Sequence, residues 1–335
     1  MSQSITVING DGIGPEIMDA TLRTLDTLAC DFNYEFAEAG QTAFEKSGDL
    51  LPEATLESIR RNRIVLKGPL TTPVGKGFRS INVLLRRKFD LYANVRPVIS
   101  IPGTQSRFED VDIITVRENT EGAYLAADAK LSEDGMTAES KMVVTRNGCE
   151  RVSRYAFELA RAEGRKKVTL VHKANILKIV SGMFLDVARE VASDYPDIES
   201  DEMIVDAICM KLVMNPQQFD VIVTTNLFGD ILSDLCAGLV GGLGLAPGAN
   251  IGKDAAMFEA VHGSAPDIAG QKIANPCALM LASAMMLAHL GMKDKAEKLR
   301  RVIRDTISEG DDVTPDLGGT GSTVTMTDAI IDRLG

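Results

Sequence analysis

Short runs of β-branched and other apolar residues alternate along the chain with longer segments in which apolar residues recur every three or four positions. The short runs predict buried strands. They occupy residues 5–9, 63–68, 112–118, 167–175, 202–208 and 220–226. The longer segments predict helices, among them residues 16–30, 80–89 and 149–164. Strands that alternate with helices predict an α/β fold with a largely parallel sheet.

The domain organisation leaves little trace in the composition. No internal repeat, low-complexity tract or linker rich in Pro and Ser interrupts the pattern, so a domain boundary has to be structural. A length of 335 residues predicts about two domains. Residues 123–143 are polar and weakly periodic, which predicts an arm or a hairpin that contacts another subunit.

The charge balance narrows the class of partner. The chain has 47 acidic and 36 basic residues, a formal net charge of −11 at pH 7, and no tract of Lys and Arg, which argues against nucleic acid. The longest apolar stretch, residues 235–251, is interrupted by glycines and a proline and suits a bend better than a membrane span. Without a leader segment, we expect a cytoplasmic protein or the processed product of mitochondrial import. Five cysteines without CxxC spacing are typical of buried thiols in a reducing compartment.

An acidic pair is the first candidate for chemistry. Asp230 and Asp234 are one helical turn apart, so both carboxylates project from the same helix face. Like charges this close repel, which indicates a hard divalent cation, Mg²⁺ or Mn²⁺. An isolated acidic pair is more typical of a solvated helix face. Here Leu232, Leu235 and Cys236 make the helix largely apolar, which favours the metal hypothesis.

Three arginines stand at or just past the ends of predicted elements. Arg86 lies on the helical segment 80–89, Arg96 precedes Pro97 and is therefore extended, and Arg117 closes the strand 112–118. A guanidinium binds a carboxylate through two parallel hydrogen bonds, so three of them predict a polyanionic ligand. Each arginine alone is more typical of a surface ion pair, and the hypothesis rests on the set.

The opening segment GDGIGPE invites comparison with a dinucleotide-binding turn. Gly10, Gly12 and Gly14 follow the spacing G-x-G-x-G, whereas the dinucleotide fingerprint requires G-x-G-x-x-G. Pro15 suits the first turn of a helix. The segment therefore predicts a tight turn before a helix. A second glycine-bearing segment, residues 259–276, is typical of a polar loop.

Several motifs occur in one order over nearly the whole chain. They are GDGIGPE, GPLTTPVGKGFRSINVLLRRKFDLYANVRP, VRENTEGAY, HKANI, TTNLFGDILSDL, EAVHGSAPDIAGQKIANP and DLGGTGST. In this combination the chain resembles the β-decarboxylating dehydrogenases of 2-hydroxy acids, and its motifs are most similar to those of the isocitrate enzymes. The resemblance implies the isocitrate/isopropylmalate dehydrogenase-like fold, which is not a Rossmann fold, with two domains around a mixed, largely parallel sheet. It implies a large cofactor-side domain from residues 1–95 and 245–335, and a small domain from residues 96–244 that carries the dimer interface and the arm 123–143.

The resemblance also implies an activity and a set of roles. The activity is NAD-dependent oxidative decarboxylation of isocitrate to 2-oxoglutarate and CO₂ with Mg²⁺ or Mn²⁺, in a homodimer or larger homo-oligomer with shared active sites and no nucleic acid or membrane partner. The implied catalytic residues are Tyr124 and the partner subunit's Lys173, and the implied metal ligands are Asp230, Asp234 and the partner subunit's Asp206. The implied substrate-binding residues are Ser80, Asn82, Arg86, Arg96 and Arg117. The implied cofactor-binding residues are Thr72, His262, Gly263, Ala265, Asp267, Ile268 and Asn275.

Substrate choice has alternatives. Ser80 begins a helix and is also a typical N-cap, but together with Asn82 it matches the isocitrate enzymes, whereas isopropylmalate enzymes place apolar residues here. Lys76 and the short arm depart from the isocitrate pattern and leave homoisocitrate or a wider substrate range open. Lys173 alone would be interpreted as an ion-pair lysine. An isopropylmalate enzyme and a non-catalytic regulatory subunit of a hetero-oligomeric dehydrogenase are the remaining alternatives.

Two residues bear on the choice of nicotinamide cofactor. Asp267 and Ile268 stand where NADP-linked relatives carry a lysine and a tyrosine. An aspartate accepts hydrogen bonds from the ribose hydroxyls of NAD and repels the 2′-phosphate of NADP, so NAD is expected. An aspartate in such a loop is also typical of a loop cap.

Overall fold

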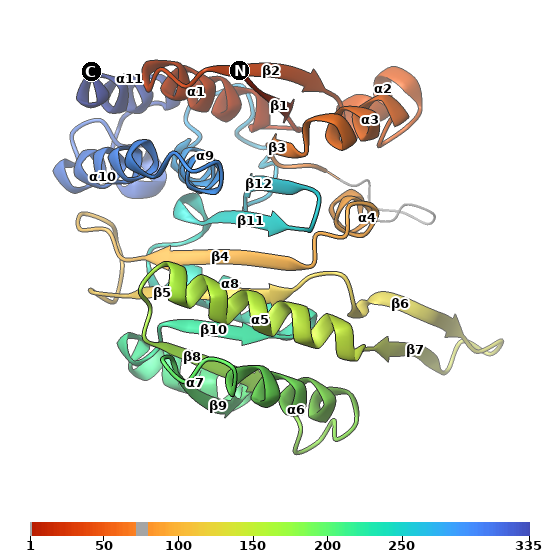
Figure 1. The fold of residues 1–335 in the computed structure, drawn as a ribbon. Coiled ribbons are helices and arrows are strands. Elements are labelled where there is room, and N and C mark those ends of the chain that lie inside the picture. The colour runs from red at the N-terminus through yellow and green to blue at the C-terminus, as the bar shows by residue number, and fades with distance from the viewer. Residues whose placement is uncertain (1, 72–79) are drawn as a thin grey trace.

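The computed structural model describes residues 2–71 and 80–335 (Figure 1). Ten of its strands form one sheet. In their spatial order they are β2 (Phe32–Ala37), β1 (Gln3–Ile8), β3 (Ile64–Lys67), β12 (Ala256–Ala260), β11 (Pro247–Ile251), β4 (Ala93–Ile99), β5 (Asp112–Glu118), β10 (Val221–Thr224), β8 (Lys167–His172) and β9 (Glu199–Ile204). The pairs β12–β11, β11–β4 and β4–β5 are antiparallel, and the others are parallel. The predicted α/β fold with a mixed, largely parallel sheet is confirmed.

Helices cover both faces of this sheet (Figure 1). They are α1 (Gly14–Thr27), α2 (Gln41–Ser47), α3 (Glu53–Asn62), α4 (Ile81–Lys88), α5 (Arg146–Ala162), α6 (Val180–Ala192), α7 (Val205–Met214), α8 (Asn226–Leu239), α9 (Cys277–His289), α10 (Lys293–Glu309) and α11 (Thr323–Leu334). Pro15 lies in the first turn of α1, as its position in the sequence predicts. None of the helices in the described part of the chain is both long and apolar enough to cross a membrane.

The arm predicted at residues 123–143 is a β-hairpin. Its strands β6 (Gly122–Leu131) and β7 (Ala138–Val143) pair with each other in a separate antiparallel sheet that projects away from the main sheet (Figure 1). The hairpin is therefore confirmed, while its contact with another subunit stays a prediction. The predicted domain boundaries fall inside β4 and just before β11, and the two-domain division also stays a prediction.

The two faces of the sheet differ in how their cores are built. On one face, here called the continuous face, Val95, Val116, Ala249 and Phe258 belong to a single apolar cluster that extends under α1, α5, α6, α9 and α10. The opposite face, here called the divided face, carries two separate clusters. One lies under α7 and α8, and the other lies under α3 and α4.

Polar side chains of the central strands fill the space between the two clusters of the divided face. Because successive side chains of a strand point to opposite faces, each of these polar residues has an apolar neighbour on the continuous face. The polar residues are Lys67, Asn94, Arg96, Arg117, Asn250 and Glu259, all of them buried.

One strand prediction is wrong in part. Residues 202–208 were expected to form a single buried strand, but β9 ends at Ile204 and α7 begins at Val205. A short apolar run does not distinguish a strand from a buried helix by periodicity alone. Asp206 therefore lies in the first turn of a helix. Residues 235–251, expected to hold a bend between elements, contain the end of α8, the short turn Leu243–Leu245 and all of β11.

Candidate active site

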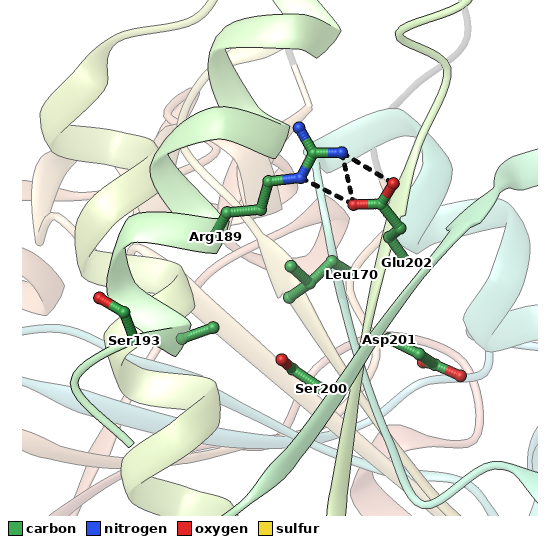
Figure 2. A pocket seen from close by; sticks show the side chains of 7 residues that line it. Leu170, Arg189, Ser193, Ser200, Asp201 and Glu202 are labelled. Atoms are coloured by element: carbon green, nitrogen blue, oxygen red, sulfur yellow. Dashed lines mark hydrogen bonds and ion pairs between the residues drawn. The ribbon is translucent and has the colours of Figure 1, made fainter. Parts of the chain in front are cut away.

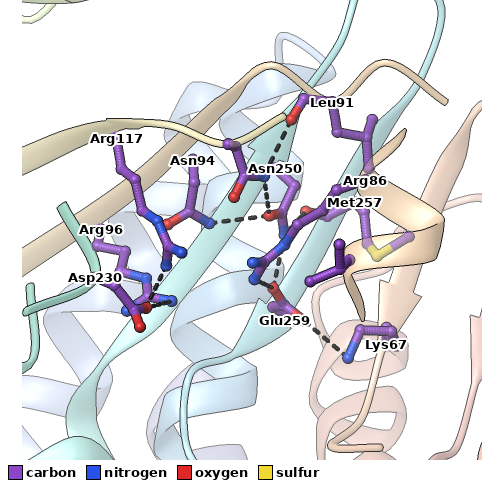
Figure 3. Close-up of polar contacts among 12 residues, drawn as sticks. Lys67, Arg86, Leu91, Asn94, Arg96, Arg117, Asp230, Asn250, Met257 and Glu259 are labelled. Carbon is purple, nitrogen blue, oxygen red and sulfur yellow. Dashed lines mark hydrogen bonds and ion pairs between the residues drawn. The ribbon is translucent and has the colours of Figure 1, made fainter. Parts of the chain in front are cut away.

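The three predicted arginines converge on the divided face, where polar side chains of the central strands lie between the two apolar clusters (Figure 3). Arg96 projects from β4, Arg117 from the end of the adjacent strand β5, and Arg86 from the last turn of α4. Their side chains are 9%, 1% and 11% exposed respectively. Because all three guanidinium groups are largely buried, none of them belongs to a solvent-exposed surface ion pair. A buried guanidinium group needs a polar or charged partner.

Asp230 and Asp234 project from α8 towards two of these arginines. Arg96 reaches both carboxylates, at 3.7 Å for Asp230 and 3.2 Å for Asp234. Arg117 forms an ion pair with Asp230 and donates to Asn226 Oδ1 from Nε at 3.1 Å and from Nη2 at 2.7 Å. A Cβ atom at Gly229 would lie 2.5 Å from Arg117 Cγ, so the glycine permits this close approach. The acidic pair is thus held by arginines on its protein side.

The electrostatics of this cluster keep its groups in defined protonation states. Burial favours a higher pKa for Asp230, but the positive charge of Arg117 and a hydrogen bond from Tyr124 outweigh burial and lower it. Burial and the nearby Arg86 lower the pKa of Arg117 to about 10, so Arg117 remains charged at neutral pH. Burial and the hydrogen bond that Tyr124 donates to Asp230 raise the pKa of Tyr124, so its hydroxyl stays protonated.

The acidic pair has the donor chemistry of a magnesium or manganese site. Its carboxylates remain 36% and 56% exposed, which leaves oxygen atoms available to a hard cation. Within the described residues, no group of three or more His, Cys, Asp or Glu side chains could hold an ion. The third predicted ligand, Asp206, instead forms an ion pair with Lys173, and this contact holds the pKa of Asp206 below its usual value.

The predicted site residues therefore fall into two groups within one chain. Tyr124, Asp230 and Asp234 lie with the arginines, whereas Lys173 and Asp206 lie together near the end of β8 and the start of α7. Within a single chain the members of each group lie together, but the two groups do not contact each other.

A buried polar network beneath the arginines was not predicted from the sequence (Figure 3). Glu259 lies 2.8 Å from Lys67 and 3.6 Å from Arg86, and it accepts a hydrogen bond of 2.7 Å from Asn250. Burial favours a higher pKa for Glu259, but Lys67, Arg86 and the hydrogen bonds lower it to about 2. Asn250 in turn accepts hydrogen bonds of 3.0 Å from Asn94 and from a second asparagine in the loop after β5. The available signal was a lone polar residue inside an apolar strand, as in the sequence AMFEA of β12.

The predicted specificity residues Ser80 and Asn82 lie at the first turn of α4. Ser80 is the N-cap, and its Oγ accepts a hydrogen bond of 3.5 Å from the Val83 amide. Asn82 Oδ1 is buried and has no hydrogen-bond partner within the described part of the chain. Thr72, a predicted cofactor-binding residue, and Lys76, which bears on the substrate prediction, lie outside the described residues.

The GDGIGPE turn organises the predicted cofactor side of the site. The buried Asp11 carboxylate accepts hydrogen bonds from the amides of Gln41 at 3.0 Å, Thr42 at 2.9 Å and Thr71 at 2.7 Å. Next to it, Ile13 N donates to the carbonyl oxygen of residue 264 at 2.9 Å. The segment is a tight turn, as predicted, but it also anchors the loop 259–276, which the sequence analysis missed. An aspartate between two glycines with positive φ was the available signal.

Five predicted cofactor residues lie on the loop between β12 and α9. They are His262, Gly263, Ala265, Asp267 and Ile268. Burial lowers the pKa of His262, so its ring is neutral at pH 7. Asp267 is exposed, and no hydrogen bond to its carboxylate occurs among the described residues, which does not support a loop cap. Asn275 is buried at the start of α9, where it accepts a hydrogen bond of 2.9 Å from the Cys277 amide and donates one of 3.0 Å to Asp316.

A separate hollow of about 480 Å³ lies between α6 and β9, away from this site (Figure 2). Its only guanidinium belongs to Arg189, which donates to both carboxylate oxygens of Glu202 at 2.8 Å. The main charges of this hollow already neutralise each other. It offers no comparable site for a charged ligand.

Buried arginines beside a helix-borne acidic pair have, on this α/β sheet, the chemistry that suits a small polyanion and a hard divalent cation. The pattern of the isocitrate/isopropylmalate dehydrogenase family matches residues 4–332. The mitochondrial NAD isocitrate dehydrogenase catalytic subunit 5 of Arabidopsis thaliana is 49% identical over 330 residues, which cover 98% of this chain and 88% of that protein. The 3-isopropylmalate dehydrogenase of Archaeoglobus fulgidus is also 49% identical, over 332 residues and 99% of each protein.

A solved structure extends the comparison. The isocitrate dehydrogenase from Methylococcus capsulatus superimposes with a TM-score of 0.96 at 57% identity, covering 100% of this chain and 99% of that one. The chain therefore belongs to the isocitrate/isopropylmalate dehydrogenase family, and it has the fold of that family. It is an enzyme of the dehydrogenase/decarboxylase class. Relatives of equal identity carry different substrate names, so family membership alone does not fix the substrate.

Proposed function

We propose that this chain catalyses the NAD-dependent oxidative decarboxylation of isocitrate to 2-oxoglutarate and CO₂ with Mg²⁺ or Mn²⁺. The observation that carries the proposal is the convergence of Arg86, Arg96 and Arg117 beside the acidic pair. Isocitrate is a tricarboxylate, and three buried guanidinium groups match its charge. The enzyme would act in the cytoplasm or as a processed mitochondrial form.

The first turn of α4 supports isocitrate over isopropylmalate. It carries the polar Ser80 at its N-cap and Asn82 in its first turn, on the helix that also carries Arg86. The Asn82 side chain has amide hydrogens that can be donated to a carboxylate, and its Oδ1 has no hydrogen-bond partner among the described residues. An isopropyl group would leave these polar groups without partners, at a cost in binding free energy. The 57% identity with a structure named as an isocitrate dehydrogenase gives further support.

The residues of the site divide the proton transfers between them. The partner subunit's Lys173 would accept the proton of the substrate hydroxyl. Tyr124, which remains protonated because burial and its contact with Asp230 raise its pKa, would donate a proton to the enol carbon after CO₂ leaves. Arg96 and Arg117 would hold the carboxylates in place through both steps.

The acidic pair would hold the metal together with the partner subunit's Asp206. A divalent cation bound there would act as a Lewis acid that stabilises the negative charge on the substrate oxygen, and NAD would accept the hydride from C2. Arg96 and Arg117 already orient the two carboxylates of the pair, so the donor oxygens are positioned before the cation binds.

Exposed apolar side chains support a dimer with shared sites. Ile176 and Ile179 follow Lys173 and are 67% and 82% exposed, and Met210 and Met214 follow Asp206 on α7 and are 57% and 73% exposed. Ile231, next to Asp230 on α8, is 53% exposed. Large apolar side chains left exposed near functional residues are typical of an interface. A two-fold axis through this surface would bring the Lys173–Asp206 group of one subunit towards the acidic pair of the other.

Turnover of the purified chain tests the proposed reaction. We expect NADH formation and CO₂ release with isocitrate, NAD and Mg²⁺, and loss of turnover when EDTA removes the metal. Turnover of 3-isopropylmalate should be negligible, and homoisocitrate, which the sequence leaves open, should be turned over more slowly than isocitrate. Faster turnover of either would refute the substrate assignment, and a folded chain without turnover on any of the three would favour a regulatory subunit.

A charge reversal tests the cofactor assignment. Replacing Asp267→Lys together with Ile268→Tyr should remove the repulsion of the 2′-phosphate and narrow or invert the NAD/NADP ratio of kcat/KM. The control Asp332→Lys makes a similar charge change at an exposed position of α11 and should leave the ratio unchanged. An unchanged ratio in the double variant would dismiss the two residues as discriminators.

A further inference from the structure

A second cavity lies on the continuous face of the sheet, behind the candidate active site. Its volume is about 450 Å³, within the range of small-molecule sites. Its floor is apolar and comes from the central strands, with Val95, Ile114, Ala249 and Phe258 among its residues. Its walls come from α5 on one side and from α9 and α10 on the other.

The rim of this cavity is positively charged although the chain as a whole is acidic. Four fixed cations and two carboxylates line it, whereas the whole chain carries a formal charge of −11. One of the cations, Arg165, is already paired with Asp112 at 2.7 Å and Asp220 at 3.0 Å. The charge available to a ligand therefore comes from α10.

Two arginines on α10 are placed to receive one anion. Arg300 and Arg304 are one helical turn apart and both line the cavity. Within the described residues, Arg304 has no carboxylate within ion-pair distance, and Arg300 has only Glu297 at 4.0 Å, at the limit of an ion pair. Adjacent guanidinium groups repel each other, and a bound carboxylate would relieve that repulsion.

We infer that this cavity binds an amphiphilic monocarboxylate. The carboxylate lies between Arg300 and Arg304, and the aliphatic chain lies along the floor formed by residues such as Phe258 and by Met285 of α9. The charged rim and the apolar floor require a ligand with both properties, because a small anion would leave the floor in contact with water and a neutral hydrocarbon would leave the arginines unpaired. Binding here does not depend on the proposed reaction.

Methyl NMR of the intact chain labelled at the methionine methyl groups tests the site, with octanoate as the probe. Met285 lines the cavity, whereas Met257 lies on the divided face near the arginine cluster. We expect a saturable shift of the Met285 signal, assigned through Met285→Leu, and no shift of Met257. Hexanoate should bind about tenfold more weakly than octanoate, because it buries two fewer methylene groups.

Matched variants locate the carboxylate. Arg304→Gln should weaken octanoate binding about tenfold, whereas Arg301→Gln, which removes an exposed charge from the same helix outside the cavity lining, should not change it. Arg86→Gln should also leave the affinity unchanged. The inference is overturned if Met285 shows no saturable shift, if octanol binds as tightly as octanoate, if Arg301→Gln weakens binding as much as Arg304→Gln, or if Arg86→Gln abolishes it.

Discussion

The two faces of the central strands have opposite chemistry although the same short segments build both. Phe258 and Glu259 are sequence neighbours and both are buried, yet Phe258 joins the largest apolar cluster and Glu259 accepts contacts from Lys67 and Arg86. Burying charges contributes little net stability, because desolvation offsets the attraction between partners. The continuous face therefore supplies stability, while the divided face gives up apolar contact to hold charged side chains. The residues that stabilise the fold and the residues of the candidate site therefore lie on opposite faces of one sheet.

The largest expected effect concerns whether the divided face of one chain alone contains a complete active site. Arg86→Ala should be inactive because it loses a substrate anchor, and Lys173→Met because it loses the proton acceptor. If the two groups of residues meet across a dimer, mixing and reassociating equal amounts should give about half heterodimers, each with one intact site, and return about a quarter of wild-type activity. The measurement is NADH formation after tagged purification has established subunit exchange.

Each variant alone, taken through the same dissociation and mixing, is the control and should stay inactive. Purified heterodimers without activity would show that each chain has to supply both groups itself, provided that the two sites of the parent dimer work independently.

The next effect concerns stability on the divided face. Glu259→Leu leaves the Lys67 ammonium buried without its partner and should lower the free energy of unfolding by about 3–5 kcal/mol. Glu259→Leu combined with Lys67→Met replaces the pair by apolar groups and should restore most of that loss without restoring activity. Urea unfolding and turnover measure the two properties. Equal stability of the single and the double variant would contradict a coupled pair.

The same pair should give the divided face a dependence on acid. The pKa of Glu259 is lowered to about 2, below the value of about 4.3 expected in an unfolded chain. Its contribution to stability is therefore complete above about pH 4.3 and is lost as the pH falls towards 2. The difference in unfolding free energy between the parent and the Glu259→Leu/Lys67→Met variant should be constant from pH 7 to 5. Below about pH 4 the parent should lose stability relative to the variant. A constant difference down to pH 3 would contradict the lowered pKa.

The smallest effect belongs to the continuous face. Ile114→Val removes one buried methylene group and should cost about 0.5–1.5 kcal/mol of unfolding free energy. The kcat/KM of the folded variant should stay within about twofold of the parent, because no polar contact changes. A large loss of activity with this small loss of stability would show that the two faces are not independent. Urea unfolding and steady-state kinetics give the two numbers.

Local sequence patterns predicted the elements better than their long-range partners. Helical spacing correctly placed Asp230 and Asp234 on one face of α8, and the end of β5 correctly indicated where Arg117 projects. Arg96 was also expected at or just past the end of an element, but it lies in the middle of β4, a strand that was not predicted. The Lys67–Glu259 pair was missed because its members come from strands far apart in the chain, and a lone polar residue in an apolar strand does not identify its partner. The division of residues 202–208 was missed because a short apolar run suits either type of element.

The position of β11 and β12 in the sheet also has a consequence for the order of events during synthesis. These strands are made late, yet they lie between β3 and β4, which are made early. A nascent chain that lacks residues 247–260 can form only two half-sheets, with the pairing edges of β3 and β4 open to other chains. The hairpin of β11 and β12 is the last piece of the sheet, and its arrival joins the halves and brings Glu259 to the arginines. The candidate active site can therefore form only after most of the chain has been synthesised. Until then, β3 and β4 are the strands whose open edges a chaperone would have to shield.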